Sequence, residues 1–315
     1  MSKTLTLAQP AIEKQVRQRS LWIDAFDRFR RNKMAVGSLA FIIFVLLTAV
    51  FGPIISPYDP LRQNLLDVAK PPSMAHWFGT DSLGRDYLTR VMMGGRTAFL
   101  VAVVVTTITT VMGVLIGTSA AYWGRWFDNL IMRLTDIIMA FPHLLLAMFI
   151  AGTIRPRFLD LTKSITWLRG TGVADYLVVF GALAVVSWPG YARLIRGQVL
   201  SLVHSEFIAA ERMLGASSWK IMRDHLIPNA LGPVIVALSA QFGGAMLLES
   251  SLSFLGIGIQ PPGASWGNMI SDNLLTWRYQ PHLLAIPGIV LTLVVLAFNF
   301  LGDGLNDALN PRARR

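Results

Sequence analysis

Six long stretches of this chain contain no Asp, Glu, Lys or Arg, and no other feature limits its possible folds so strongly. A helix needs about 20 apolar residues to cross a bilayer, with a range of about 17–25. The six stretches are 34–55, 97–123, 137–154, 176–192, 226–248 and 282–302. Only 15% of the residues are charged, whereas a soluble domain carries about 25%. We therefore predict an all-α integral membrane protein with six transmembrane helices.

The predicted organisation has three parts. A leader at 1–33 contains an amphipathic helix, because apolar residues recur at helical spacing between Leu21 and Phe29. A six-helix membrane domain occupies 34–303, and a short tail follows at 304–315. We expect the spans at about 34–55, 97–123, 134–154, 176–199, 227–257 and 282–303, with a large inner loop at 200–228.

The positive charges predict how the chain is oriented. If the N-terminus is inside, the inner segments carry 18 of the 28 Lys and Arg residues and the outer segments carry 10. This bias places both termini in the cytoplasm. The basic residues are spread over loops beside the membrane, with no recognition module around them, so nucleic-acid binding is not expected. The leader cations fix the topology or also contact anionic lipid headgroups; they are Arg17, Arg19, Arg28, Arg30, Arg31 and Lys33.

The first outer loop is about 40 residues long and rich in proline, which makes a continuous helix unlikely there. Its charged residues Asp81, Arg85 and Asp86 can form a local salt-bridge cluster. Two interpretations stay open: a structured cap held by those pairs, or a docking surface for an external partner.

A few residues within the spans are unusual. Pro142, Pro189 and Pro287 each remove a backbone hydrogen bond and can kink a helix. We expect His143, next to Pro142, to be a packed, hydrogen-bonded residue rather than part of a pathway. Glu249 lies near the outer end of the fifth span, and its charge predicts that it faces a cavity or a partner and not lipid.

The inner loop before the fifth span has the pattern of two short helices. Residues 206–214 favour a helix, Gly215 breaks or caps it, and Ser217 or Ser218 can cap a second helix. We expect Pro228 to end that second helix, close to the start of the fifth span. The flanking spans exclude a DNA-binding helix-turn-helix.

Nothing in the chain suggests catalysis. The absence of cysteine excludes disulfides, thiolate metal sites and cysteine nucleophiles. The chain lacks a Gly-x-x-x-x-Gly-Lys-Ser/Thr phosphate-binding loop, and no span carries metal-ligand spacing or a Ser–His pair. We therefore expect no catalytic residues, no metal site and no cofactor bound by this chain.

Several motifs resemble those of bacterial ABC importer permeases. Ala209-Ala210, Gly215 and Leu226-Ile-Pro-Asn229 resemble the coupling loop of that family. The outer segment 76–86, with 94–97, 136–142, 249–256 and 261–267, resembles the dipeptide/oligopeptide/nickel subfamily and its C-type subunit. Two features depart from the pattern. Glu211 occupies the position of a small residue, and the outer segment 155–175 is longer than in many relatives, with no assigned role.

The resemblance implies an ATP-driven importer in a bacterial or archaeal cytoplasmic membrane. This chain would supply half of the translocation path, and its partners would be a second permease, two ATPase subunits that bind ATP and Mg, and an extracytoplasmic binding protein. Di- and oligopeptides are the first cargo, with nickel chelates, glutathione, oligosaccharides or another small solute as alternatives. The implied ATPase-coupling residues are Glu206, Ala209, Ala210, Gly215, Ala216, Ser217, Pro228 and Asn229. The implied outer-face contact or gate residues are Asp81, Arg85, Asp86, Glu249 and Trp266.

Two other classes of protein were considered. A stand-alone channel or secondary transporter would need charges or broken helices within the membrane, and only His143 and Glu249 offer any. Neither residue accounts for the coupling loop. An intramembrane enzyme would need a catalytic cluster, which the spans do not contain.

Overall fold

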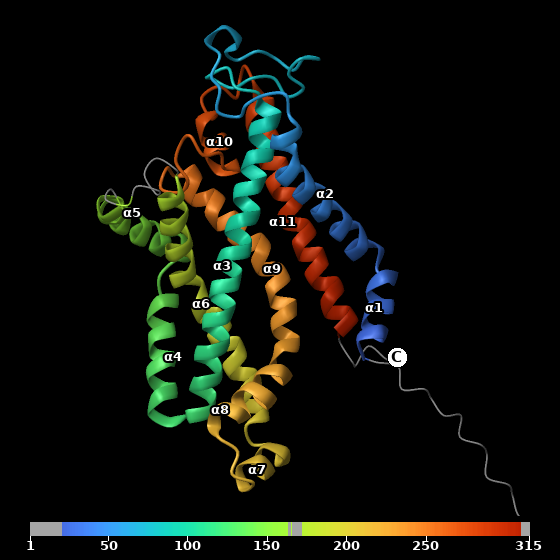
Figure 1. Ribbon diagram of the computed structural model, residues 1–315, viewed down its shortest axis with the longest axis vertical. Coiled ribbons are helices and arrows are strands. Elements are labelled where there is room, and N and C mark those ends of the chain that lie inside the picture. Colours follow the sequence, from blue (N-terminus) through green and yellow to red (C-terminus); the bar gives the residue numbers. More distant parts are fainter. Residues whose placement is uncertain (1–20, 163–164, 166–171, 310–315) are drawn as a thin grey trace, which may run out of the picture.

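The computed structural model describes residues 21–162, 165 and 172–309, and within those ranges it contains helices and turns but no β-strand (Figure 1). The predicted residues Arg17 and Arg19 lie outside the described ranges, as does the end of the tail. The helices are α1 (Leu21–Arg31), α2 (Lys33–Ile55), α3 (Tyr87–Trp123), α4 (Arg125–Met139), α5 (His143–Thr162), α6 (Val173–Leu202), α7 (Glu206–Met213), α8 (Ser218–Ile221), α9 (Ile227–Phe254), α10 (Trp266–Asp272) and α11 (Pro281–Leu309).

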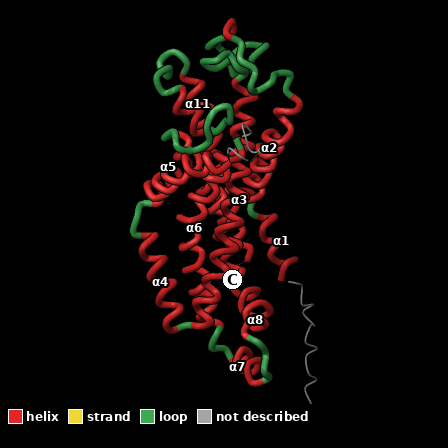
Figure 2. Tube along the Cα trace, turned by 60° about the vertical axis from the view of Figure 1, so that its left-hand side comes forward, coloured by secondary structure: helices red, strands yellow, loops and turns green. Residues whose placement is uncertain are grey.

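The long helices run side by side, and the two ends of the molecule carry different structures. Figure 2 shows loops gathered at one end and the short helices α7 and α8 at the other. Five of the described helices are long and apolar enough to cross a membrane, if the segment from α8 to α9 is counted as one helix. The number is six if α4 and α5 together form one bent span. The predicted all-α membrane architecture is confirmed.

The predicted third span, 134–154, is not one straight helix. α4 ends at Met139, α5 begins at His143, and the two are bent by 90°. Pro142 lies in the break, where its missing N–H and its ring prevent a helix from continuing. α5 then extends to Thr162, so part of the outer segment 155–175 is helical and is tied to the start of α6 by an Arg155–Asp175 ion pair of 2.7 Å.

Other helix ends also differ from the predicted spans. α3 begins at Tyr87, ten residues before the apolar stretch, because the side chain of Asp86 caps it by accepting from the Thr89 N–H at 2.9 Å. α11 continues to Leu309, so the first half of the predicted tail is helical. Helix α1 confirms a helix in the described part of the leader.

Glycines allow α3 and α6 to pack closely, and this pair has the most extensive contact in the chain. A Cβ atom at Gly117 would lie 2.4 Å from the carbonyl oxygen of Ala192, and one at Gly113 would lie 2.3 Å from Cβ of Tyr191. In a bilayer, packing contacts replace the hydrophobic drive between helices, so small residues determine where two helices can meet.

The buried apolar residues form a large cluster and a second one nearer α7 and α8. The larger cluster joins α2, α3, α9 and α11 through residues such as Val45, Val105 and Val294. The second joins α6 to α7, α8 and α9, and includes Ile195, Ile208 and Ile221. The short inner helices are therefore fixed to the membrane helices by their own apolar contacts.

We predict that Gly117→Ala destabilises the protein, by about 1–3 kcal/mol, because the added methyl group would overpack the contact with α6. Thermal unfolding of the purified chain in detergent measures the effect. The matched control is Gly181→Ala in α6, where no atom lies within 4 Å of the added Cβ. That change should be neutral or slightly stabilising; equal losses in the two variants would contradict the packing argument.

Candidate functional sites at the two membrane faces

The inner site is the α7–turn–α8 unit at the end of the molecule opposite the outer loops (Figure 1). Gly215 makes the turn between the two helices, with φ +79°, a conformation that suits glycine. Its N–H donates to the carbonyl of Arg212 at 3.1 Å, and the N–H of Ala216 donates to that of Glu211 at 3.1 Å. Ser217 then caps α8 by accepting from the Lys220 N–H at 3.3 Å. The predicted break at Gly215 and cap at Ser217 are confirmed.

Each inner helix has a buried anchor and an exposed apolar surface. Ile208 of α7 and Ile221 of α8 are fully buried. Four large apolar side chains point away from the chain, and Met213 and Leu214 are each 83% exposed. Large apolar side chains exposed together on one short unit are typical of an interaction site. This inner patch consists of Phe207, Met213, Leu214 and Trp219.

The predicted coupling residues fall on or near this unit. All but one are exposed, and Ala216 is half-buried against the inner apolar cluster. The exposed residues are Glu206, Ala209, Ala210, Gly215, Ser217, Pro228 and Asn229. The sequence analysis missed the four apolar residues of the inner patch. Their position close to a turn between two short helices could have predicted that they are exposed.

Pro228 does not end the second inner helix, contrary to the sequence prediction. α8, a π-helical turn at Met222–Leu226 and α9 form one continuous helix from Ser218 to Phe254. The π turn closes when the N–H of Ile227 donates to the carbonyl of Met222. A proline ring clashes with the carbonyl four residues before it in a regular α-helix, and the wider turn just ahead of Pro228 relieves that clash.

Two side-chain contacts brace the inner unit. The guanidinium of Arg212 lies 5.1 Å from the ring centre of Tyr122 in α3. Glu211, the residue that departs from the family pattern, lies 3.4 Å from His225 in the π turn. Glu211 is half-buried and engaged within the chain, which accounts for its difference from the exposed alanines before it.

At the outer end, a buried ion-pair cluster holds the first loop onto α3. The carboxylate of Asp81 accepts from Nε of Arg85 at 2.7 Å and lies 3.5 Å from Nε of Arg90. It also accepts from the backbone N–H groups of Leu83 and Arg85, each at 2.9 Å. All three charged side chains are buried. Charges at this depth need a counter-charge and hydrogen bonds, and Asp81 and Arg85 have both. Arg90 is paired with Asp81, but its buried Nη1 has no hydrogen-bond partner among the described residues.

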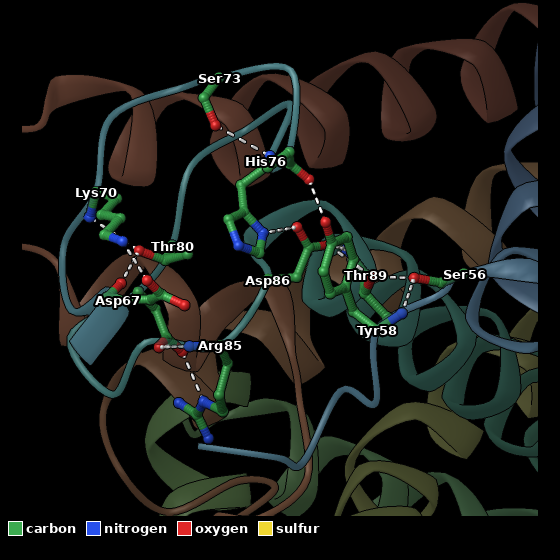
Figure 3. Close-up of polar contacts among 12 residues, drawn as sticks. Ser56, Tyr58, Asp67, Lys70, Ser73, His76, Thr80, Arg85, Asp86 and Thr89 are labelled. Carbon is green, nitrogen blue, oxygen red and sulfur yellow. Dashed lines mark hydrogen bonds and ion pairs between the residues drawn. The ribbon is translucent and has the colours of Figure 1, made fainter. Parts of the chain in front are cut away.

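Asp86 joins the loop to the helix that follows it (Figure 3). One carboxylate oxygen caps α3 through Thr89, and the other lies 2.9 Å from Nδ1 of His76. The His76 ring packs against that of Tyr58, with ring centres 4.6 Å apart, and the Tyr58 hydroxyl donates to the carbonyl of Ala75 at 2.5 Å. These contacts favour a structured cap held by ion pairs, the first of the two interpretations. The loop at 56–86 is called the outer cap below.

Trp266 and Glu249 fix the second outer segment. The indole N–H of Trp266 donates to the carbonyl of Val91 at 2.9 Å, and its ring covers Gly94 and Gly95 of α3. Glu249 is fully buried and accepts from Ser253 at 2.7 Å and from Ser250 at 3.3 Å. Its neighbours are protein groups and not lipid. Within the described chain it therefore faces serines and not a cavity; Ser265, just before α10, also interacts with its carboxyl group.

The five predicted outer-face residues are therefore buried supports and do not form a contact surface in this structure. The groups that do point outward were missed by sequence reasoning, because they are ordinary apolar residues within loops. They include Leu66, Met74, Trp77, Leu275 and Tyr279.

The pKa values of two outer-loop carboxyls are shifted. The hydrogen bond from Lys70 lowers the pKa of Asp67. Burial raises the pKa of Asp272 at the end of α10, and the nearby Arg90 and Arg85 act in the opposite direction. Within the described residues, no group of three or more His, Asp or Glu side chains is placed to hold a metal ion.

Comparison with known proteins identifies the family. Residues 113–315 match the model of the binding-protein-dependent transport system inner membrane component. Residues 20–72 match the N-terminal transmembrane domain of oligopeptide transport permease C. The chain belongs to the binding-protein-dependent transport permease family. The first match contains α7, α8 and every long helix after α3, and the second contains α1 and α2.

Curated relatives align over nearly the whole chain. The dipeptide transport system permease protein DppC of Bacillus subtilis is 39% identical over 93% of this chain and 86% of its own length. The oligopeptide transport system permease protein OppC of the same organism is 36% identical over 94% and 91%. The glutathione transport system permease protein GsiD of Escherichia coli (strain 536) is 36% identical over 94% and 92%.

Membership settles the general role of the chain. It is a multi-pass inner membrane permease of the ABC importer type, and ATPase activity in this family belongs to separate subunits. Such importers also contain a partner permease and a binding protein in general.

We predict that Asp81→Asn loosens the outer cap, because Arg85 and Arg90 would stay buried without their counter-charge. Breaking a buried pair on one side costs about 3–5 kcal/mol. Protease cleavage of the outer loops in spheroplasts measures the loosening. Asp59→Asn, at an exposed position of the same loop, is the control and should leave cleavage unchanged; unchanged cleavage in Asp81→Asn would contradict the structural role.

Proposed function

We propose that this chain forms half of the translocation path of an ATP-driven importer for di- and oligopeptides. A second homologous permease supplies the other half, two ATPase subunits bind ATP and Mg, and an extracytoplasmic binding protein delivers the cargo. Both termini lie in the cytoplasm. The family match, and relatives whose names specify dipeptide and oligopeptide transport, support this proposal.

One structural observation carries the coupling part of the proposal. The inner patch is apolar and exposed, yet it is mounted on helices with buried anchors at Ile208 and Ile221. A patch of that kind would be unfavourable in water unless a partner covers it. An ATPase subunit that packs on it could push α8, and α8 continues directly into α9.

The outer cap supports the proposed contact with the binding protein. Its buried ion pairs give the loop a fixed shape, and its exposed apolar residues, among them Met74 and Trp77, offer a surface to a delivering protein. Asp81, Arg85, Asp86, Glu249 and Trp266 would then act through the shape of the cap and not by direct contact.

The cargo is tested with the assembled importer in proteoliposomes that contain ATP. We expect uptake of a labelled tripeptide that depends on the binding protein and on ATP. Uptake of labelled glutathione or of a labelled nickel chelate, with no uptake of the labelled tripeptide, would assign one of those alternatives instead.

We predict that the double variant Met213→Ser with Leu214→Ser loses ATPase subunits on copurification, because it removes the two most exposed apolar groups of the inner patch. The control is Leu65→Ser with Leu66→Ser, a pair that is similarly exposed on the outer loop. That pair should copurify with the ATPase subunits as the unaltered chain does. The reverse pattern would overturn the proposed orientation.

We also predict that Gly215→Val uncouples uptake from ATP hydrolysis. A β-branched residue cannot adopt φ +79° without strain, so the turn that orients α7 against α8 would shift. Peptide uptake per ATP hydrolysed, measured in proteoliposomes, should fall, while the subunit still inserts. Gly197→Val, at an exposed helical glycine of α6 with open space around it, is the control; unaltered coupling in Gly215→Val would argue against the mechanism.

A further inference from the structure

A hollow of about 400 Å³ lies between the start of α5, the middle of α6 and the middle of α9. Its depth follows from the position of Gln241, 14 residues after the start of α9 and 13 before its end. The volume is at the lower end of the range for small-molecule sites, about 300–1,000 Å³. Because Gln241 lies midway along α9, the hollow is inside the membrane region, away from both faces.

Four polar side chains interrupt the otherwise apolar lining of this hollow. His143 contributes an imidazole, Ser187 a hydroxyl, Tyr191 a phenol and Gln241 an amide, and no Asp, Glu, Lys or Arg lines it. Gly190 and Gly244 leave the space between these side chains open. Four hydrogen-bonding side chains from three helices thus converge on one space.

These side chains are largely without partners in the described chain. Tyr191 donates to the carbonyl of Ala237 at a long 3.5 Å, and no described residue offers a hydrogen-bond partner to the side chains of His143, Ser187 or Gln241. His143 is also exposed, so the sequence expectation of a packed, hydrogen-bonded histidine is wrong. Unsatisfied polar groups are costly against hydrocarbon, so this surface faces water, a solute or another protein.

The break between α4 and α5 adds an independent observation. Ala140, Phe141 and Pro142 are not in a regular helix, and the bend there is 90°. Irregular backbone at membrane depth is tolerated only where protein buries it or where it lines a water-filled cavity. His143 directly follows this break and lines the hollow.

We propose that this hollow is the part of the chain that contacts the solute during passage, and that it takes the amide backbone of a peptide. The amide N–H and C=O groups of a peptide match the donors and acceptors of the wall, none of which comes from Asp, Glu, Lys or Arg. The absence of fixed charge also suits a path that must release peptides with different side chains. This inference rests on the proposed function.

The experiment uses the cysteine-free character of the chain. Gln241→Cys and Ser187→Cys are assembled into the importer and treated with a charged methanethiosulfonate reagent. We expect modification that slows when binding protein, tripeptide and ATP are added together, because peptide then occupies the hollow. The matched controls are Ala245→Cys and Leu183→Cys, one turn away on the same helices and buried. The importer without introduced cysteine sets the background from the partner subunits.

The two test positions should react at least about tenfold faster than their controls, because an apolar environment that raises a thiol pKa by one unit cuts its thiolate fraction tenfold. Modification no faster than the controls would overturn the proposal and assign the hollow to contact with the second permease. A modification rate that stays the same when binding protein, tripeptide and ATP are added would also overturn the proposal.

A second measurement tests the hydrogen-bonding chemistry. Gln241→Leu should lower tripeptide uptake per ATP hydrolysed by between about two- and tenfold, the effect of one lost hydrogen bond, and Gln241→Asn should restore part of it. Equal uptake in Gln241→Leu and the unaltered chain would contradict the role of the amide. If the unaltered importer takes up no peptide, the proposed cargo fails, while labelling without peptide still shows whether water lines the hollow.

Discussion

The bilayer contains no water to bond with the backbone, and the rest of the structure follows from this constraint. Each described segment long enough to cross it is a helix that pairs its own N–H and C=O groups. At two departures from regular α-helix, residues 140–142 and the π turn before Pro228, the chain has polar groups alongside or a rearranged turn. Fixed charge is concentrated near the ends of the molecule, in the cluster around Asp81 and in the contacts around Glu211.

Much of the fold could be predicted from the sequence, because charge exclusion and helical period are local properties. The uncharged stretches identified the spans, Gly215 identified the inner turn, and Ser217 identified the cap of α8. The helix ends could not be predicted in the same way. α3 begins at Tyr87 because Asp86 reaches its backbone, and the helix before Pro228 continues because a π turn accommodates the ring. Both outcomes depend on tertiary or non-standard geometry that hydropathy does not encode.

The sites were predicted less completely, because burial is a property of the whole fold. Asp81, Glu249 and Trp266 were predicted as outer-face contact or gate residues, and their charge or size could not show that they point inward. The inner patch was missed for the opposite reason, since Met213 and Leu214 look like core residues until the turn at Gly215 leaves them outside. The sequence could not show that His143 lines a hollow with Ser187 and Gln241, because this arrangement depends on the bend between α4 and α5.

The unbroken helix from Ser218 to Phe254 has a geometric consequence. Its 37 residues make a rod about 55 Å long, well beyond the roughly 30 Å hydrocarbon core. One end of this rod is α8, and Glu249 lies near the other end. A tilt of about 5° around its midpoint would displace each end by roughly 2–3 Å in opposite directions. When one end of the helix moves in one direction, the other end therefore moves in the opposite direction. Such a motion is expected for a gate that opens to one side as it closes to the other.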